Sequence, residues 1–368
     1  IFTNGDNDTF PLWYSQEVEE VRTDVRVICL PYLITDWYID QMKSKYYDSE
    51  PIPFSLEPHQ YVQGTRDQVP VFERMDDYVE LSQVIDFVGS DDARTRVSTS
   101  MGEQTDYFPT KKFKITVDSA KVLEKGVVKP ENAAEIVKEI KWGIKSRYIL
   151  KNDMMILDLL ATSDWERPIY FVSVGSGNET NLRDYFQMEG FASRFVPIKT
   201  KFDYQSIGRI DTDILYDNLM NKFKWGNMGK PDVYLNENTR RTIRIVKVRN
   251  NFGRLAKALV QEGKTEKAKE VMERGLEILP VEKMPLDYFD THFVEAFFEA
   301  GMEEKGAEIA LNMSETAMND LRFYIQLETK FKNQAEQDKQ LCFATVQWLN
   351  DVAKRYQQKE VYVYIGSA

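Results

Sequence analysis

The sequence contains little cysteine and histidine, the residues that most often bind transition metals, form disulfides or make up a nucleophile-base pair. Its 368 residues include only two cysteines and two histidines. Cys29 lies in an apolar run of strand length and Cys342 in a helical pattern, so we expect both to be small core residues. Neither His59 nor His292 has a recognisable nucleophile or acid partner in the sequence, which argues against a Ser-His-Asp arrangement and a histidine-based zinc site.

Positive charge is also scarce. The chain has 48 Lys and Arg against 59 Asp and Glu, which gives a formal net charge of −11. Binding to nucleic acid requires clustered positive charge, so we expect no nucleic-acid partner. The densest basic segment, at residues 240–249, has the spacing of a solvated helix face.

Long apolar runs are absent as well. No stretch approaches the roughly 18 apolar residues of a membrane helix, and no signal peptide is recognisable. The chain begins at Ile1-Phe2-Thr3, in a pattern typical of a strand and without an initiator Met. We therefore expect it to be part of a longer protein whose membrane or targeting segments lie upstream.

Enough apolar residues are present to build sizeable cores. Hydrophobic residues make up 42% of the chain and aromatic residues 12%. Residues 1–45 follow a strand-helix-strand pattern that is typical of a βαβ unit. Residues 46–130 are interrupted by Pro and Gly and predict an irregular excursion, and residues 131–200 return to the α/β pattern. We predict an α/β domain with a parallel or mixed sheet over residues 1–235.

Residues 236–368 predict an all-α domain of tetratricopeptide-like helical hairpins, most clearly at residues 250–280. That repeat places large residues on one helix, then a turn, then small residues that let the second helix pack closely. Gly263 fits the turn, and Ala268 and Gly275 fit the small positions. The positions on the first helix are filled by Phe252, Leu255, Ala256 and Leu259.

The most polar loop follows the first predicted strand. We expect no cofactor there, with a divalent cation such as Ca²⁺ or Mg²⁺ on the carboxylates of Asp6 and Asp8 as the alternative. The loop is not an EF-hand, because the fifth and sixth positions counted from Asp6 are Phe10 and Pro11. A structural Asx-turn that caps a helix at Asp8 or Thr9 also explains it, and contact with a sugar or phosphate is a further alternative. The candidate ligand-binding residues are Asn4, Asp6, Asn7 and Asp8.

A second candidate is the pair Asp36-Trp37 at the predicted start of another helix. An aromatic face can stack on a sugar ring while a neighbouring carboxylate binds its hydroxyls. A helix-capping Asp followed by a packed Trp explains the pair equally well. The loop at residues 174–180 also follows a predicted strand, where ligands of open α/β sheets collect, but it lacks the GxGxxG spacing of a phosphate fingerprint.

Several segments resemble a bacterial family of large multispanning membrane proteins of unknown function. They are NGDNDTFPLWY at 4–14, RTDVRV at 22–27, TDWYI at 35–39, RPIYF at 167–171 and YFQMEG at 185–190. In that family an N-terminal membrane domain is followed by an α/β region and tetratricopeptide-like helices. The membrane half is similar to the GT-C class of glycosyltransferases, which use lipid-linked sugars. A related animal protein is regarded as a protein O-mannosyltransferase.

The resemblance implies an extracytoplasmic domain on the periplasmic side of a bacterial membrane, tethered by the upstream transmembrane domain of the same protein. It implies that the α/β part helps to bind either the sugar donor or an acceptor, which is a glycan or a protein. Residues 4–9 and Asp36-Trp37 would form the ligand surface. In GT-C enzymes the catalytic carboxylate usually lies in the membrane half. The resemblance therefore assigns no catalytic residue to this chain and implies that the chain alone is inactive. The alternative function is a non-enzymatic scaffold that binds a protein partner through its helical repeats.

Overall fold

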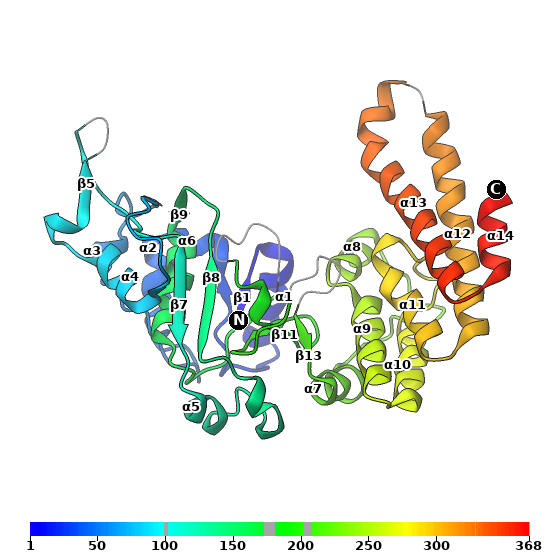
Figure 1. Ribbon diagram of the computed structural model, residues 1–368, viewed down its shortest axis with the longest axis horizontal. Helices are drawn as coiled ribbons and strands as arrows, with labels where there is room; N and C mark the ends of the chain where they lie inside the picture. Colours follow the sequence, from blue (N-terminus) through cyan, green and yellow to red (C-terminus); the bar gives the residue numbers. More distant parts are fainter. Residues whose placement is uncertain (99–101, 173–180, 202–207, 328, 368) are drawn as a thin grey trace. The chain divides into compact units, whose positions relative to one another are not determined.

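The computed structural model describes residues 1–98, 102–172, 181–201, 208–327 and 329–367 (Figure 1). The chain divides into two compact units. The first comprises residues 1–188 and 192–209, and the second comprises residues 189–191 and 210–368. The segment 210–235, which the sequence pattern assigns to the α/β domain, packs with the second unit.

A mixed sheet of short strands forms the base of the first unit. β1 (Phe2–Thr3) pairs in parallel with both β2 (Ile28–Cys29) and β10 (Tyr170–Phe171). Because α1 (Asp6–Glu17) connects β1 with β2, the predicted strand-helix-strand unit is confirmed. β12 (Ser193–Phe195) pairs antiparallel with β10 and with β11 (Phe186–Met188). Among the described residues the strand order is β13-β11-β12-β10-β1-β2, with β13 at Arg209–Ile210.

The excursion predicted at residues 46–130 is less irregular than its sequence indicates, because several of its strands pair with strands that lie later in the chain. β3 (Gln68–Pro70) pairs with β9 (Tyr148–Leu150). A separate sheet has the order β4-β7-β8, at Val79–Glu80, Lys112–Thr116 and Glu139–Gly143. β5 (Arg96–Ser98) and β6 (Gln104–Asp106) form a hairpin.

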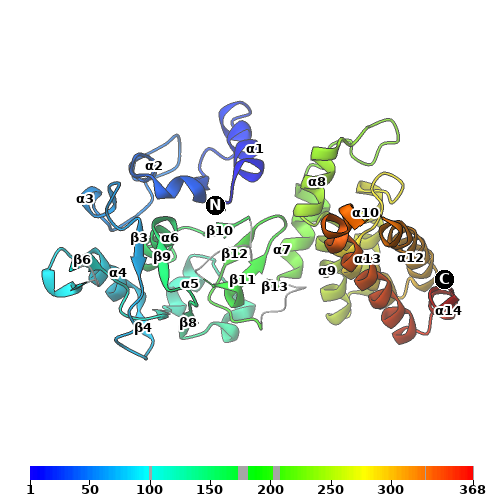
Figure 2. The ribbon, with the colours of Figure 1, turned by 90° about the horizontal axis from the view of Figure 1, so that it is seen from above.

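Helices complete the first unit and enclose its core. α6 (Lys151–Thr162) is buried over nearly its whole length, as its apolar sequence predicts. α1 and α2 (Asp36–Met42) both lie along the upper side of this unit in Figure 2. The remaining helical segments are η1 (Leu30–Ile34), α3 (Pro58–Tyr61), α4 (Leu81–Gly89), η2 (Ala93–Thr95), α5 (Ser119–Glu124), η3 (Pro130–Glu135) and η4 (Arg183–Tyr185).

The second unit is helical, so the predicted order of an α/β part followed by an all-α part is confirmed. α9 (Val248–Gln261) and α10 (Thr265–Ile278) pack as a hairpin, and Gly263 at the turn between them has a φ of 74°. The large and small positions predicted for this pair are buried. The other helices are α7 (Thr212–Tyr216), η5 (Asp217–Lys222), α8 (Glu237–Ile245), η6 (Tyr288–Asp290), α11 (Thr291–Glu299), α12 (Glu303–Gln326), α13 (Thr329–Arg355) and α14 (Lys359–Ser367).

Gly253 lets α9 approach α11 closely, and replacing it by alanine is expected to destabilise the second unit by about 1–3 kcal/mol. A Cβ at this position would lie 2.6 Å from the Cα of Phe293 and 2.8 Å from its backbone nitrogen, so the two helices would have to separate. Chemical denaturation, monitored by circular dichroism, measures the loss of stability. The control is Gly366→Ala on α14, where a Cβ meets nothing within 4 Å and where better helix propensity predicts a gain of up to about 1 kcal/mol. Equal effects of the two substitutions would contradict the close-packing argument.

Candidate functional site

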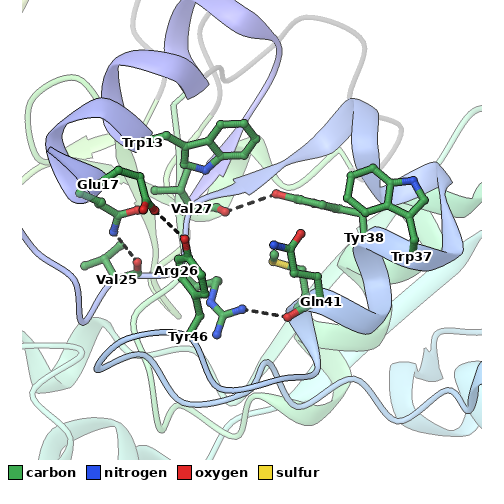
Figure 3. Close-up of a pocket in the computed structure, with 11 residues that line it drawn as sticks. Trp13, Glu17, Val25, Arg26, Val27, Trp37, Tyr38, Gln41 and Tyr46 are labelled. Atoms are coloured by element: carbon green, nitrogen blue, oxygen red, sulfur yellow. Dashed lines mark hydrogen bonds between the residues drawn. The ribbon is translucent and has the colours of Figure 1, made fainter.

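A cavity of about 230 Å³ lies between α1 and α2 in the first unit (Figure 3). α1 contributes one wall, α2 contributes the opposite wall, and the chain at residues 25–27 lies between them. The lining residues are Trp13, Gln16, Glu17, Val25, Arg26, Val27, Trp37, Tyr38, Gln41, Met42 and Tyr46.

Aromatic rings form a continuous row beside the cavity, and three of them, Trp13, Trp37 and Tyr38, line it. Phe10 stacks on Trp13 with ring centroids 5.7 Å apart, and Trp13 stacks on Tyr32 at 6.2 Å. Tyr32 in turn contacts Trp37 at 6.2 Å, and Trp37 meets Tyr38 edge-on at 5.5 Å. Trp37 is 58% exposed although it contacts two other rings. A large apolar face is therefore available to a ligand.

The α1 wall is fixed by the amide of Gln16. Its Nε2 donates to the backbone carbonyls of Arg22, at 2.8 Å, and Val25, at 2.7 Å, which holds the returning chain beneath the helix. Both amide protons are used in this way. No described residue donates to its Oε1, so this oxygen is an acceptor on the cavity wall.

The α2 wall contains Tyr38, whose hydroxyl is held by hydrogen bonds, and Gln41, whose side-chain amide is free to bind a ligand. The hydroxyl of Tyr38 accepts a 2.9 Å bond from the backbone N–H of Cys29 and donates to the carbonyl of Val27 at 3.4 Å. Burial raises the pKa of Tyr38 to about 12, so this hydroxyl remains protonated at neutral pH. The side chain of Gln41 points into the cavity (Figure 3) and bonds to no other described residue.

Arg26 forms the floor of the cavity and is only 4% exposed. Its Nη1 donates to the carbonyl of Gln41 at 3.2 Å, and its Nη2 donates to the carbonyls of Ser44 at 2.8 Å and Ser49 at 3.2 Å. Its Nε lies 3.4 Å from the hydroxyl of Ser49. Burial, together with the charge of nearby Arg167, lowers the pKa of Arg26. The guanidinium thus ties α2 and the following turn to β2, chiefly through carbonyl groups.

Glu17 at the end of α1 closes the rim. It accepts hydrogen bonds from the hydroxyls of Tyr46, at 2.7 Å, and Tyr47, at 2.6 Å. These bonds lower the pKa of Glu17, so the carboxylate is ionised at neutral pH. Because Tyr46 and Tyr47 belong to the turn that Arg26 holds, the rim and the floor of the cavity are mechanically connected.

The polar loop predicted as a ligand surface lies at the start of α1 and does not line this cavity. α1 begins at Asp6, before the predicted caps, because Gly5 occupies the N-cap position with a φ of 124°. Asp8 accepts a 2.8 Å bond from the backbone N–H of Asn4, whereas Asn4, Asp6 and Asn7 are exposed. Within the described parts of the chain no group of three or more acidic, His or Cys residues is arranged to hold a metal. The divalent cation at Asp6 and Asp8 stays a prediction.

The two residues of the Asp36-Trp37 pair have different structural roles. Asp36 accepts hydrogen bonds from the backbone N–H groups of Trp37, at 2.7 Å, and Gln63, at 3.1 Å. The Gln63 bond is the main cause of the lowered pKa of Asp36. Its carboxylate therefore organises the start of α2, while Trp37 lines the cavity. The third predicted element, the loop at residues 174–180, lies outside the described residues.

Sequence reasoning missed most of the cavity. Trp13 and Gln16 are three residues apart, which places them on one face of a helix, and this spacing was the one local signal available. Gln41 and Arg26 carry no local signal, because the cavity forms only when α2 packs opposite α1. The expectation that His59 has no acid partner is wrong, since its Nε2 lies 2.8 Å from the Oδ2 of Asp91 on the surface.

The fold defines an α/β domain, with a cavity between two of its helices, that is followed by a helical domain. Residues 1–214 match the family described as TMEM260-associated domain 2. Because the match covers more than half of the chain, the chain belongs to this family, which is linked to a membrane protein. Comparisons with curated proteins and with solved structures give no match. None of the described helices combines the length and the apolar character needed to cross a bilayer.

Proposed function

We propose that this chain is the extracytoplasmic ligand-binding part of a membrane glycosyltransferase-like protein, on the periplasmic side, and that the cavity between α1 and α2 binds the acceptor or the sugar donor. The observation that carries the proposal is the composition of the cavity. Trp13 and the 58% exposed Trp37 line it together with the Gln41 amide and the Oε1 of Gln16, which are free to bind hydroxyls. Family membership supports the link to a membrane protein, and the resemblance to GT-C glycosyltransferases supports the chemistry.

In this proposal the domain recognises a ligand and the membrane half performs the transfer. The cavity holds one carboxylate, Glu17, and both of its oxygens accept tyrosine hydroxyls. A carboxylate held in this way has a lowered pKa and is a poor general acid or base at neutral pH. The partner of the chain is then the transmembrane domain of the same protein, and the chain alone is inactive.

The replacement Trp37→Ala in the complete membrane protein is expected to lower sugar transfer about tenfold at subsaturating acceptor or donor, the equivalent of about 1.4 kcal/mol of binding. The loss should fall mainly on KM, because Trp37 would bind the ligand and take no part in bond breaking. Transfer from lipid-linked sugars by protein in membranes is the measurement. The matched control is Tyr14→Ala, since Tyr14 is 56% exposed on α1 and lies outside the cavity lining. If transfer is the same in both variants, the cavity is not the ligand site.

That negative result would favour a second candidate function, a scaffold that binds a protein partner through the helical unit. One observation supports it. Large apolar side chains are exposed near the end of α12 and along α13, and exposed apolar side chains can mark an interaction surface. They are Phe323, Ile325, Phe331 and Phe343.

A further inference from the structure

We infer that the cavity between α1 and α2 binds one uncharged sugar ring and rejects the phosphate-bearing part of a sugar donor. The inference rests on the proposed function, and it narrows the choice between acceptor and donor. It follows from the groups that remain free on the cavity wall, from the charges that are already committed, and from the size of the space.

The free hydrogen-bonding groups are neutral. The Gln41 amide offers both a donor and an acceptor, and the Oε1 of Gln16 offers an acceptor. No described residue accepts a bond from the indole N–H of Trp13 or Trp37, so these are two further donors in the aromatic row. Mixed donors and acceptors beside aromatic faces match sugar hydroxyls, which both donate and accept.

The one cation on the wall is poorly placed to bind phosphate. Arg26 is the only Lys or Arg among the eleven lining residues. A guanidinium binds phosphate best through two parallel N–H groups. Both protons of Nη2 and one of Nη1 are directed to backbone carbonyls, and Nε faces the Ser49 hydroxyl. A single N–H of Nη1 is left, so no fork is available without breaking the contacts that hold the floor.

Glu17, the one carboxylate in the cavity lining, disfavours a ligand that carries negative charge. Glu17 is ionised at neutral pH because its pKa is lowered by the hydroxyls of Tyr46 and Tyr47. A phosphate in the cavity would be repelled by this fixed carboxylate. The charge of Arg26 would attract it, but without a free pair of N–H groups to bind it directly. An uncharged ring has no such penalty.

The volume sets the number of rings. Sites for drug-sized ligands usually measure about 300–1,000 Å³, whereas this cavity measures about 230 Å³. The space therefore suits one ring with its neighbours extending into solvent. Trp37 lines the cavity and is also 58% exposed, so a second ring of an oligosaccharide would stack on its exposed part.

The test compares neutral and phosphorylated sugars on the 368-residue chain. Methyl glycosides of common hexoses and of N-acetylhexosamine are titrated beside the matching hexose 1-phosphates, with tryptophan fluorescence and calorimetry as readouts. At least one neutral glycoside is expected to bind about tenfold more tightly than its phosphorylated counterpart. Tighter binding of the phosphates would overturn the inference and leave the proposed function standing. Absence of binding by every probe would overturn both.

Variants of Gln41 test the same point from the protein side. Gln41→Ala should weaken the neutral glycoside about fivefold or more, because it removes the free amide. Gln41→Arg should shift the preference toward the 1-phosphates, because it adds a guanidinium whose donors are uncommitted. Gln41 is exposed, and its contact with Arg26 uses the backbone carbonyl, so both variants should fold. Tyr14→Ala should change neither affinity, and a phosphate preference that does not respond to Gln41→Arg would contradict the inference.

Discussion

Replacing Arg249 by methionine is expected to destabilise the helical unit by about 3–5 kcal/mol. Arg249 lies on α9 and is 1% exposed. Its guanidinium donates to the carbonyls of Leu279 at 3.0 and 3.2 Å, of Pro280 at 3.2 Å and of Met284 at 2.5 Å, and pairs with Asp290 at 3.2 Å. Methionine fills a similar volume but leaves these buried acceptors without a donor.

The pH dependence of this loss follows from the buried carboxyl. Burial raises the pKa of Asp290 to about 6, above its ordinary value of 3.8. A raised folded-state pKa means that the folded protein holds the proton more tightly, so the stability contributed by Asp290 falls as the pH rises from about 4 to about 6. Without Arg249 the carboxyl would lose its counterion and its pKa would rise further. The cost of Arg249→Met should therefore be larger at pH 7 than at pH 4.

Hydrogen exchange of the amides in α9 and α11 measures this loss locally, which matters because a chain of two units need not unfold in one step. The matched control is Arg244→Met on α8. The Arg244 side chain is 42% exposed and pairs with Asp287 at 3.2 Å, so its removal should change stability by less than about 1 kcal/mol. Similar effects of the two substitutions would mean that the Arg249 contacts do not hold the loop between α10 and α11.

The parts of the fold that the sequence predicts are those set by nearby residues. The strand-helix-strand start and the buried helix α6 both follow from local periodicity. The hairpin of α9 and α10 shows its large and small positions in one short segment, and Gly275 lies against the rings of Phe252 and Phe293. By contrast, Val79 pairs with Phe113 and Phe113 with Trp142. Strands this short carry little pattern, and their pairing depends on chain segments far apart.

The start of α1 shows how a local rule can fail. Capping rules favour a side chain that accepts the first free N–H groups, and they pointed to Asp8 or Thr9. The N-cap is Gly5 instead, which adopts a positive φ that other residues avoid. Thr9 is buried and its hydroxyl lies 2.6 Å from that of Thr3, so it joins the helix to β1.

The candidate site was harder to predict because its groups come from three segments. The aromatic residue beside an acid identified Trp37, which lines the cavity. Arg26 could be found only once its partners were known, since they are carbonyls at the end of α2 and in the turn after it. Gln41 looks like any exposed glutamine until α1 is placed opposite it.

A buried carboxylate in the first unit carries the second large prediction: Asp158→Ala should destabilise this unit by about 3 kcal/mol. Asp158 on α6 is fully buried. It accepts bonds from the backbone N–H and the hydroxyl of Ser55, at 3.0 and 2.5 Å, and from the N–H of Leu56 at 3.3 Å. Alanine would leave the N–H groups of Ser55 and of the buried Leu56 without an acceptor and detach the segment that buries Phe54 and Leu56. Hydrogen exchange of α6 measures the effect.

Asp86→Ala on α4 is the matched control, because Asp86 is exposed and alanine improves helix propensity by a few tenths of a kcal/mol, about 0.5 at most.

Measuring stability against pH separates the effect of the Asp158 charge from the effect of its hydrogen bonds. Burial raises the pKa of Asp158 above its ordinary 3.8 in spite of the bonds from Ser55 and Leu56, so wild-type stability should fall as the pH rises from 3.8 toward the folded value. Asp158→Asn removes that slope while it retains one acceptor oxygen. If the wild type and Asp158→Asn show the same pH dependence, the carboxyl does not titrate as a buried group. The predicted loss in Asp158→Ala would then have to come from the orphaned N–H groups alone.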